Sequence, residues 1–220
     1  AVNINTASPS ELEALPGIDA LGPVRHLVSP NRIHYAHIPA WQRHYPQAKT
    51  WASAGVRERA ASQRISISFA ADLGVEAPPD WAEDIAQLPF RGSSVMTETV
   101  FYHRASRTLI LTDLIENIET AKMRGFWKLV MKLAGNHDPD GKAPIDMRAT
   151  FTDRAAARES LQQLLAWQPE RIILAHGRCY TENATAELQR AFRWLGARAV
   201  YNLKNPPPLQ GEARSGGGTG

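Results

Sequence analysis

Short β-rich runs alternate along this chain with longer segments of helical pattern, and this alternation restricts the fold more than any other feature of the sequence. The β-rich runs carry the branched and aromatic side chains that favour extended structure. Only Ser106 separates two neighbouring runs, 97–105 and 107–113, so the pair predicts a β-hairpin. All the runs together lie at 24–28, 49–53, 65–69, 97–105, 107–113 and 171–176.

Four segments have the pattern of amphipathic or capped helices. They span 38–45, 118–135, 153–167 and 183–196. In the second segment the apolar residues fall largely on one face, and Gly135 ends the pattern. Thr152 or Asp153 is placed to cap the third segment, and Asn183 the fourth. Helices that alternate with strands in this way predict a mixed α/β fold.

Two of the predicted strands end in a polar side chain that can take part in chemistry. Asp113 ends the run 107–113, and His176 ends the run 171–176. Because the carboxyl ends of strands in an open α/β sheet converge on one crevice, we expect both side chains to line a site. Arg148 precedes a helix start and could bind an anionic substrate group in the same crevice, or could pair with a surface carboxylate.

A third apolar run leads to two histidines, His34 and His37. Their i,i+3 spacing would put both rings on one side of a helical turn. Imidazole and carboxylate together suit zinc or another first-row metal ion. The sequence therefore predicts four metal ligands: His34, His37, Asp113 and His176.

Each of these residues also has a simpler explanation. Asp113 could cap a helix, and His176 precedes Gly177, where a histidine hydrogen-bonded in a turn is common. His34 and His37 could lie on a solvated helix. The pattern of residues leaves both explanations open.

Length and charge favour one soluble domain with appendages. The 220 residues include 25 Lys and Arg against 22 Asp and Glu, and the net charge of +3 does not indicate a nucleic-acid partner. No apolar run approaches the roughly 20 residues of a membrane span, so we expect no membrane partner. Cys179 is the single cysteine and the start of the chain has no signal-peptide pattern, so we expect a cytoplasmic protein.

Residues from about 20 to 195 resemble the metallo-β-lactamase fold superfamily, within it an uncharacterised branch known only as a domain of unknown function. The stretches that carry the resemblance are LGPVRHLVSPNRIHYAH, VFYHRASRTLILTDLIEN and ERIILAHG. In that superfamily a histidine-rich loop follows an early strand, an aspartate ends a later strand, and a final histidine follows the last core strand. The resemblance implies an αββα sandwich in which Asp113 stands for the metal-bridging aspartate and His176 for the last ligand.

The chain departs from the superfamily at the other ligand positions. The hallmark His-x-His-x-Asp-His loop is absent, because residues 30–33 are Pro, Asn, Arg and Ile, and only His34 and, less closely, His37 stand near it. Residues 92–94 are Gly, Ser and Ser where the middle histidine is expected. The resemblance therefore implies a reduced site for a single zinc, iron or manganese ion, with an open position for water, rather than a full dinuclear zinc centre.

Such a site implies a metallo-hydrolase-like domain that cleaves an ester, amide or phosphoester, with Asp113 and His176 as catalytic residues. The alternative is a catalytically silent domain of the same fold that holds no metal and acts as a binding or structural module. The histidine segment begins after only some twenty residues, whereas superfamily members open with several strands. If these N-terminal strands are lacking, the uncovered sheet edge would favour a homo-oligomer.

Both ends of the chain differ from the central region 20–200. Residues 2–18 resemble the first half of the helix-hairpin-helix motif of competence DNA receptors, whose hairpin presents backbone N–H groups to a DNA phosphate. Asp19 replaces the second hairpin glycine, so we expect 1–19 to form an N-terminal cap, with DNA association as a further alternative function. The tail 201–220 is rich in Pro and Gly and is predicted to be disordered.

Overall fold

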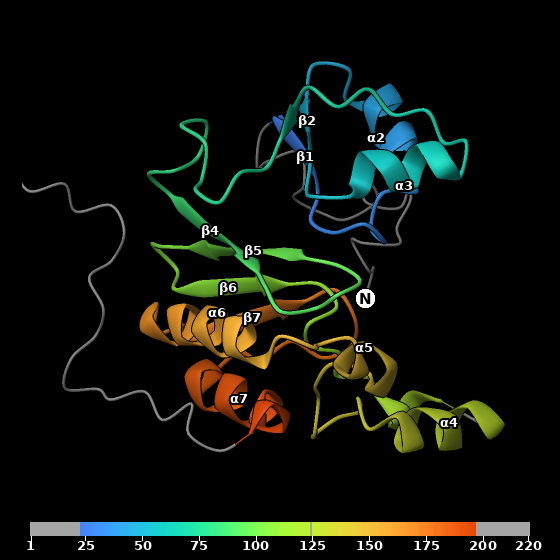
Figure 1. The fold of residues 1–220 in the computed structure, drawn as a ribbon, viewed down its shortest axis with the longest axis vertical. Coiled ribbons are helices and arrows are strands. Elements are labelled where there is room, and N and C mark those ends of the chain that lie inside the picture. The colour runs from blue at the N-terminus through green and yellow to red at the C-terminus, as the bar shows by residue number, and fades with distance from the viewer. Residues whose placement is uncertain (1–22, 124, 197–220) are drawn as a thin grey trace, which may run out of the picture.

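The computed structural model describes residues 23–123 and 125–196, which form two β-sheets with helices outside them (Figure 1). The predicted N-terminal cap at 1–19 and the predicted tail at 201–220 lie outside the described residues. None of the described helices is long and apolar enough to cross a membrane.

The first sheet contains three parallel strands in the order β1-β2-β3. These are β1 (His26–Ser29), β2 (Lys49–Ala52) and β3 (Ala71–Asp72). Parallel strands need long connections, which usually contain a helix. Here the helix α2 (Ile38–His44) joins β1 to β2, and α3 (Val56–Ser62) joins β2 to β3.

The second sheet contains four strands in the order β4-β5-β6-β7. They are β4 (Ile85–Phe90), β5 (Glu98–His103), β6 (Thr108–Leu111) and β7 (Arg171–Leu174). Strand β5 is antiparallel to both β4 and β6, and β7 returns parallel to β6. Because β6 and β7 are parallel and adjacent, the residues that follow them meet at one edge of the sheet.

Among the described residues, four helical elements lie between β6 and β7, and two more follow β7. They are η2 (Thr120–Lys122), α4 (Phe126–Ala134), α5 (Ile145–Ala149), α6 (Arg154–Ala166), α7 (Ala184–Ala191) and η3 (Arg193–Leu195). Helices α6 and α7 lie on one face of the second sheet (Figure 1). Asp153 caps α6 as predicted, because its carboxylate accepts the N–H groups of Ala155 and Ala156.

Side-chain alternation along β5 divides the second sheet into two faces. Val100 and Tyr102 are buried in the core with α6 and α7, whereas Phe101 points to the opposite face and packs edge-on against Trp81. Trp81 in turn contacts Trp51 of β2, with ring centroids 4.7 Å apart. This aromatic contact lies between the two sheets.

The far face of the first sheet is covered by helix α3. Ala52 of β2 is fully buried against Val56 and Ala60 of that helix. The layers are therefore helix, sheet, sheet and helix, as the αββα prediction requires.

Three predicted elements differ from the structure. The run 65–69 does not form a strand; its apolar side chains pack on the cluster around α3 before the chain reaches β3. The helical segment 118–135 is divided into η2 and the shorter α4, and the segment 183–196 into α7 and η3. Strand β4 was not predicted, because Gln87 and Pro89 interrupt its apolar pattern; a strand at the end of a sheet tolerates proline. The predicted hairpin is confirmed by the pairing of β5 with β6.

Candidate metal site

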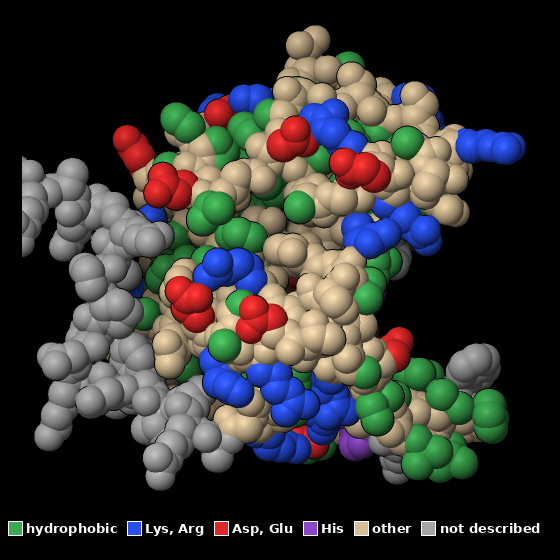
Figure 2. Space-filling view, viewed as in Figure 1, with side chains coloured by type: hydrophobic (Ala, Val, Ile, Leu, Met, Phe, Trp, Pro, Cys, Tyr) green, Lys and Arg blue, Asp and Glu red, His purple; other side chains and the backbone are tan. Residues whose placement is uncertain are grey.

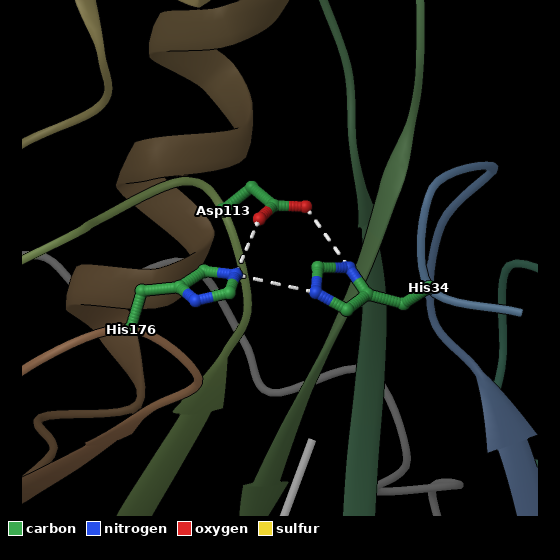
Figure 3. Close-up of side chains that lie close together, drawn as sticks. All are labelled: His34, Asp113 and His176. Atoms are coloured by element: carbon green, nitrogen blue, oxygen red, sulfur yellow. Dashed lines mark hydrogen bonds and ion pairs between the residues drawn. The ribbon is translucent and has the colours of Figure 1, made fainter. Parts of the chain in front are cut away.

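Three side chains from distant parts of the chain meet beside the ends of the two sheets (Figure 3). His34 follows β1, Asp113 follows β6 and His176 follows β7. Each offers a ligand atom that lies within 4.8 Å of the other two. Strand ends therefore bring the two imidazoles and the carboxylate together.

The distances within the group match those between ligands of one ion. His176 Nε2 lies 3.3 Å from His34 Nε2 and 3.2 Å from Asp113 Oδ1. Two ligand atoms that are each about 2.0–2.1 Å from a tetrahedral zinc ion are separated by about 3.3 Å. Two of the three distances between ligand atoms therefore match a single zinc ion, and the ligand atoms of the group all lie within 4.8 Å of one another.

Hydrogen bonds on the other side of His34 set the tautomer of its ring. His34 Nδ1 lies 3.1 Å from Asp113 Oδ2 and 3.2 Å from Asn31 Oδ1. Both of these oxygens are acceptors, so the ring carries its hydrogen on Nδ1. The lone pair of Nε2 then faces His176, as metal ligation requires.

Asn31 connects the loops that carry His34 and Asp113, and its side chain is fully buried. Its Nδ2 group donates to Asp113 Oδ2 over 2.7 Å and to the Thr112 hydroxyl over 2.9 Å. Its Oδ1 accepts the backbone N–H groups of Ile33 and His34. One amide therefore orients a ligand from each sheet.

Glu98 fixes the turn that carries Asp113. This β5 side chain is 1% exposed, and its carboxylate accepts the backbone N–H groups of Thr112, Asp113 and Leu114 over 2.7, 2.7 and 3.2 Å. Burial, reinforced by the nearby charge of Asp113, raises the pKa of Glu98 to about 7. Hydrogen bonds from the backbone N–H groups of Thr112 and Asp113 and from the Thr112 side chain partly oppose that rise of the pKa because they favour the ionised form.

The charges of the group depend on one another. Burial alone would raise the pKa of Asp113, but hydrogen bonds from His176 and His34 outweigh it and hold that pKa well below its ordinary value. The hydrogen bond to Asp113 raises the pKa of His176, against the opposing effect of burial. The group thus holds an ionised carboxylate and attracts positive charge to the position between the rings.

Gly177 lets the His176 loop approach the segment after Asp113. The His176 carbonyl accepts the N–H of Asn117 over 2.9 Å, and Gly177 has φ of +97°. A Cβ atom at position 177 would lie 2.0 Å from the Asn117 carbonyl oxygen. Glycine is therefore required there both by backbone conformation and by space.

The structure brings together three of the four ligands predicted from the sequence. His37 is not among them: it is exposed and precedes α2, so the i,i+3 spacing does not place its ring with His34. Arg148 lies in α5 outside this group of three and is partly buried. Its Nε atom is buried and has no hydrogen-bond partner among the described residues.

Sequence reasoning missed three polar residues around the group: Asn31, Glu98 and Glu116. Glu98 had a detectable signal, because an acidic residue within an apolar strand is seldom buried without a specific role. Glu116 is partly buried, which raises its pKa, although Asn136 donates a 2.5 Å hydrogen bond to it. Its negative charge acts on His176, so it lies in the surroundings of the site.

Comparison with solved structures identifies the fold. A metallo-β-lactamase from Pontibacter korlensis superposes with a TM-score of 0.55 at 12% identity, over 84% of this chain and 75% of that one. The metallo-β-lactamase from Erythrobacter litoralis superposes with a TM-score of 0.51 at 16% identity, over 83% of this chain and 74% of that one. The metallo-β-lactamase FIM-1 from Pseudomonas aeruginosa, in its mono-zinc form, superposes with a TM-score of 0.50 at 16% identity, over 81% of this chain and 71% of that one. The chain has the metallo-β-lactamase fold, as its sequence resemblance implied.

No protein-family description matches the sequence, and no curated protein is similar to it at a significant level.

Replacing Asn31 should disturb both loops at once. Asn31→Ala removes one buried hydrogen bond to the Asp113 carboxylate, which keeps His34 and His176, and the acceptor of the Ile33 and His34 N–H groups, so we expect a loss of about 2–4 kcal/mol in unfolding free energy. Urea denaturation measures this loss. Ser94→Ala, which removes a hydrogen bond from an exposed hydroxyl, is the matched control and should change stability by less than about 0.5 kcal/mol. Equal effects of the two substitutions would contradict the role of Asn31.

The charge pair of His176 and Asp113 predicts a pH-dependent stability in metal-free protein. Because folding raises the pKa of His176, its stabilising contribution is fully present below the pKa of the unfolded chain, about 6.5, and is lost as pH rises through the higher folded value. The stability difference between wild type and His176→Gln, measured in chelator, should therefore be larger near pH 6 than near about pH 9. Glu98 is present in both proteins, so its own titration largely cancels. A difference that grows with pH would contradict this assignment.

Proposed function

We propose that this chain is a metallo-hydrolase-like domain that binds one metal ion through His34, Asp113 and His176 and hydrolyses an ester, amide or phosphoester. The observation that carries the proposal is the spacing of 3.2 and 3.3 Å between ligand atoms from three separate loops. Support also comes from Asn31 and Glu98, whose buried hydrogen bonds hold the loops that carry these ligands.

Among zinc, iron and manganese we propose zinc, because the fold neighbour FIM-1 has a mono-zinc form. Two imidazoles and one carboxylate form a ligand set of catalytic zinc sites, which leave a fourth position for water, and the same set also binds non-haem iron. A zinc ion held there would supply a bound water of lowered pKa and polarise the bond to be cleaved. The mono-zinc form of FIM-1 supports the proposal, since that protein holds a single zinc ion in the same fold.

The residues of this chain would position these reactants. Asp113 would use Oδ1 for the ion, while its Oδ2 accepts hydrogen bonds from His34 and Asn31. Arg148 is proposed to bind an anionic group of the substrate. In its support, no carboxylate of the described chain pairs with Arg148, and its buried Nε atom has no partner there.

A second candidate function is a binding module that holds no metal. The observation in its favour is that the three side chains already contact one another as hydrogen-bonded and ion-paired groups. A proton shared among the two imidazoles and the carboxylate could satisfy the same atoms as an ion. Metal content distinguishes the two functions.

The metal site is tested by elemental mass spectrometry on protein purified without chelator. We expect nearly stoichiometric zinc in wild type and in His37→Ala, whose histidine lies outside the group. His34→Ala, Asp113→Ala and His176→Ala should each lose it, because removal of one of three ligands weakens binding strongly. Folded wild type that holds no metal and binds none on addition would contradict the hydrolase proposal and favour the binding module.

Hydrolysis is tested with chromogenic esters, amides and phosphoesters that differ in charge. Zinc-loaded wild type should cleave at least one class, and Asp113→Ala should not. With Arg148→Gln we expect KM for an anionic substrate to rise by about tenfold, while a neutral analogue of the same class is unaffected. Equal losses on the anionic and neutral substrates would contradict the role of Arg148.

A further inference from the structure

Helix α4 extends away from the two sheets and carries exposed apolar side chains (Figure 1). Leu129 is 56% exposed and Leu133 is 75% exposed, and Phe126 at the start of the helix is 72% exposed. The space-filling view shows hydrophobic side chains gathered at this end of the molecule (Figure 2). Large apolar side chains grouped in this way on a surface indicate a binding surface.

The sequence of α4 places these side chains along one stripe. Leu129 and Leu133 are four residues apart, and Phe126 precedes Leu129 by three, so the helix periodicity aligns all three. We call this stripe the α4 apolar face. It is present on a helix of nine residues, about 14 Å long, which can lie along a surface.

Basic residues predominate in the sequence around the α4 apolar face. Residues 120–135 include Lys122, Arg124, Lys128 and Lys132 and no Asp or Glu, whereas basic and acidic residues nearly balance over the whole chain. Of these four, Lys122 forms an ion pair with Glu119, which precedes the segment. A helix with an apolar face and a local excess of basic residues complements a surface that is apolar beneath a layer of negative charge. A lipid bilayer with anionic headgroups has that structure.

We propose that α4 attaches this protein to anionic lipid surfaces, with the α4 apolar face at the boundary between headgroups and acyl chains. The side chains of Leu129 and Leu133 would be transferred out of water at that boundary, and the basic residues would contact the headgroups. The expectation of no membrane partner rested on the lack of a spanning run. A helix that lies in the plane of the interface does not need one.

The test is co-sedimentation of the full 220-residue protein with vesicles, either of phosphatidylcholine alone or of phosphatidylcholine with phosphatidylserine. We expect binding to the vesicles that contain phosphatidylserine, and weaker binding at high salt because electrostatic attraction is screened. The double variant Leu129→Gln/Leu133→Gln should reduce the partition coefficient by about tenfold or more. Val75→Gln, at an exposed apolar residue of similar exposure (66%) outside α4, is the matched control and should bind as wild type does.

Folding and charge are checked separately. Both leucines are exposed, so circular dichroism and thermal unfolding of the double variant should match wild type. Lys128→Glu keeps the α4 apolar face and should weaken binding to the phosphatidylserine vesicles alone.

Three results would overturn the proposal. Wild type could fail to sediment with either vesicle, or the double variant could bind as wild type does. Light scattering without vesicles could instead show a dimer that the double variant converts to a monomer, in which case the α4 apolar face covers a second copy of the chain.

Discussion

The hydrogen bond from the Asn31 amide to the Asp113 carboxylate joins the two halves of this structure at the point where its candidate chemistry lies. Asn31 follows the first strand of one sheet, and Asp113 follows the third strand of the other. Both side chains are buried. A buried polar group left without a partner lowers the free energy of unfolding by about 1–3 kcal/mol, and a charged group lowers it by more. The amide satisfies Asp113 and Thr112 with its nitrogen, and Ile33 and His34 with its oxygen. The geometry of His34 relative to Asp113 therefore depends on this one side chain.

Two positions where the superfamily resemblance implies further ligands instead hold side chains engaged in hydrogen bonds. Where the superfamily's hallmark loop would supply its first ligands, this chain has Asn31, whose polar atoms are already engaged in hydrogen bonds. Where the middle histidine is expected, Ser93 instead bonds to the Thr150 hydroxyl and accepts the N–H groups of Val95 and Met96. Both positions thus hold loops together, and His34, Asp113 and His176 are left as the ligands of the proposed ion.

Some residues of the candidate site could be predicted from the sequence, and others could not. Asp113 and His176 end β-rich runs, and because β6 and β7 are parallel neighbours, the rule that strand ends converge placed both correctly. His37 could not be judged from spacing alone, since the turn before α2 carries its ring into solvent while His34 remains inside. Asn31 and Glu98 act through hydrogen bonds to residues 82 and 14–16 positions away, respectively, and such distances have no local periodicity. Strand β4 was missed for a related reason, because its pairing with β5 compensates for a sequence that includes proline.

The central claim is that His34, Asp113 and His176 hold a single metal ion. An anomalous difference map, recorded at the zinc edge from crystals grown with zinc, tests it most directly. The account predicts one strong peak in this region, about 2.0–2.2 Å from His34 Nε2, His176 Nε2 and Asp113 Oδ1, with Asn31 still hydrogen-bonded to Asp113 Oδ2. A map with no peak between these three side chains, or with the zinc held elsewhere on the protein, would contradict it.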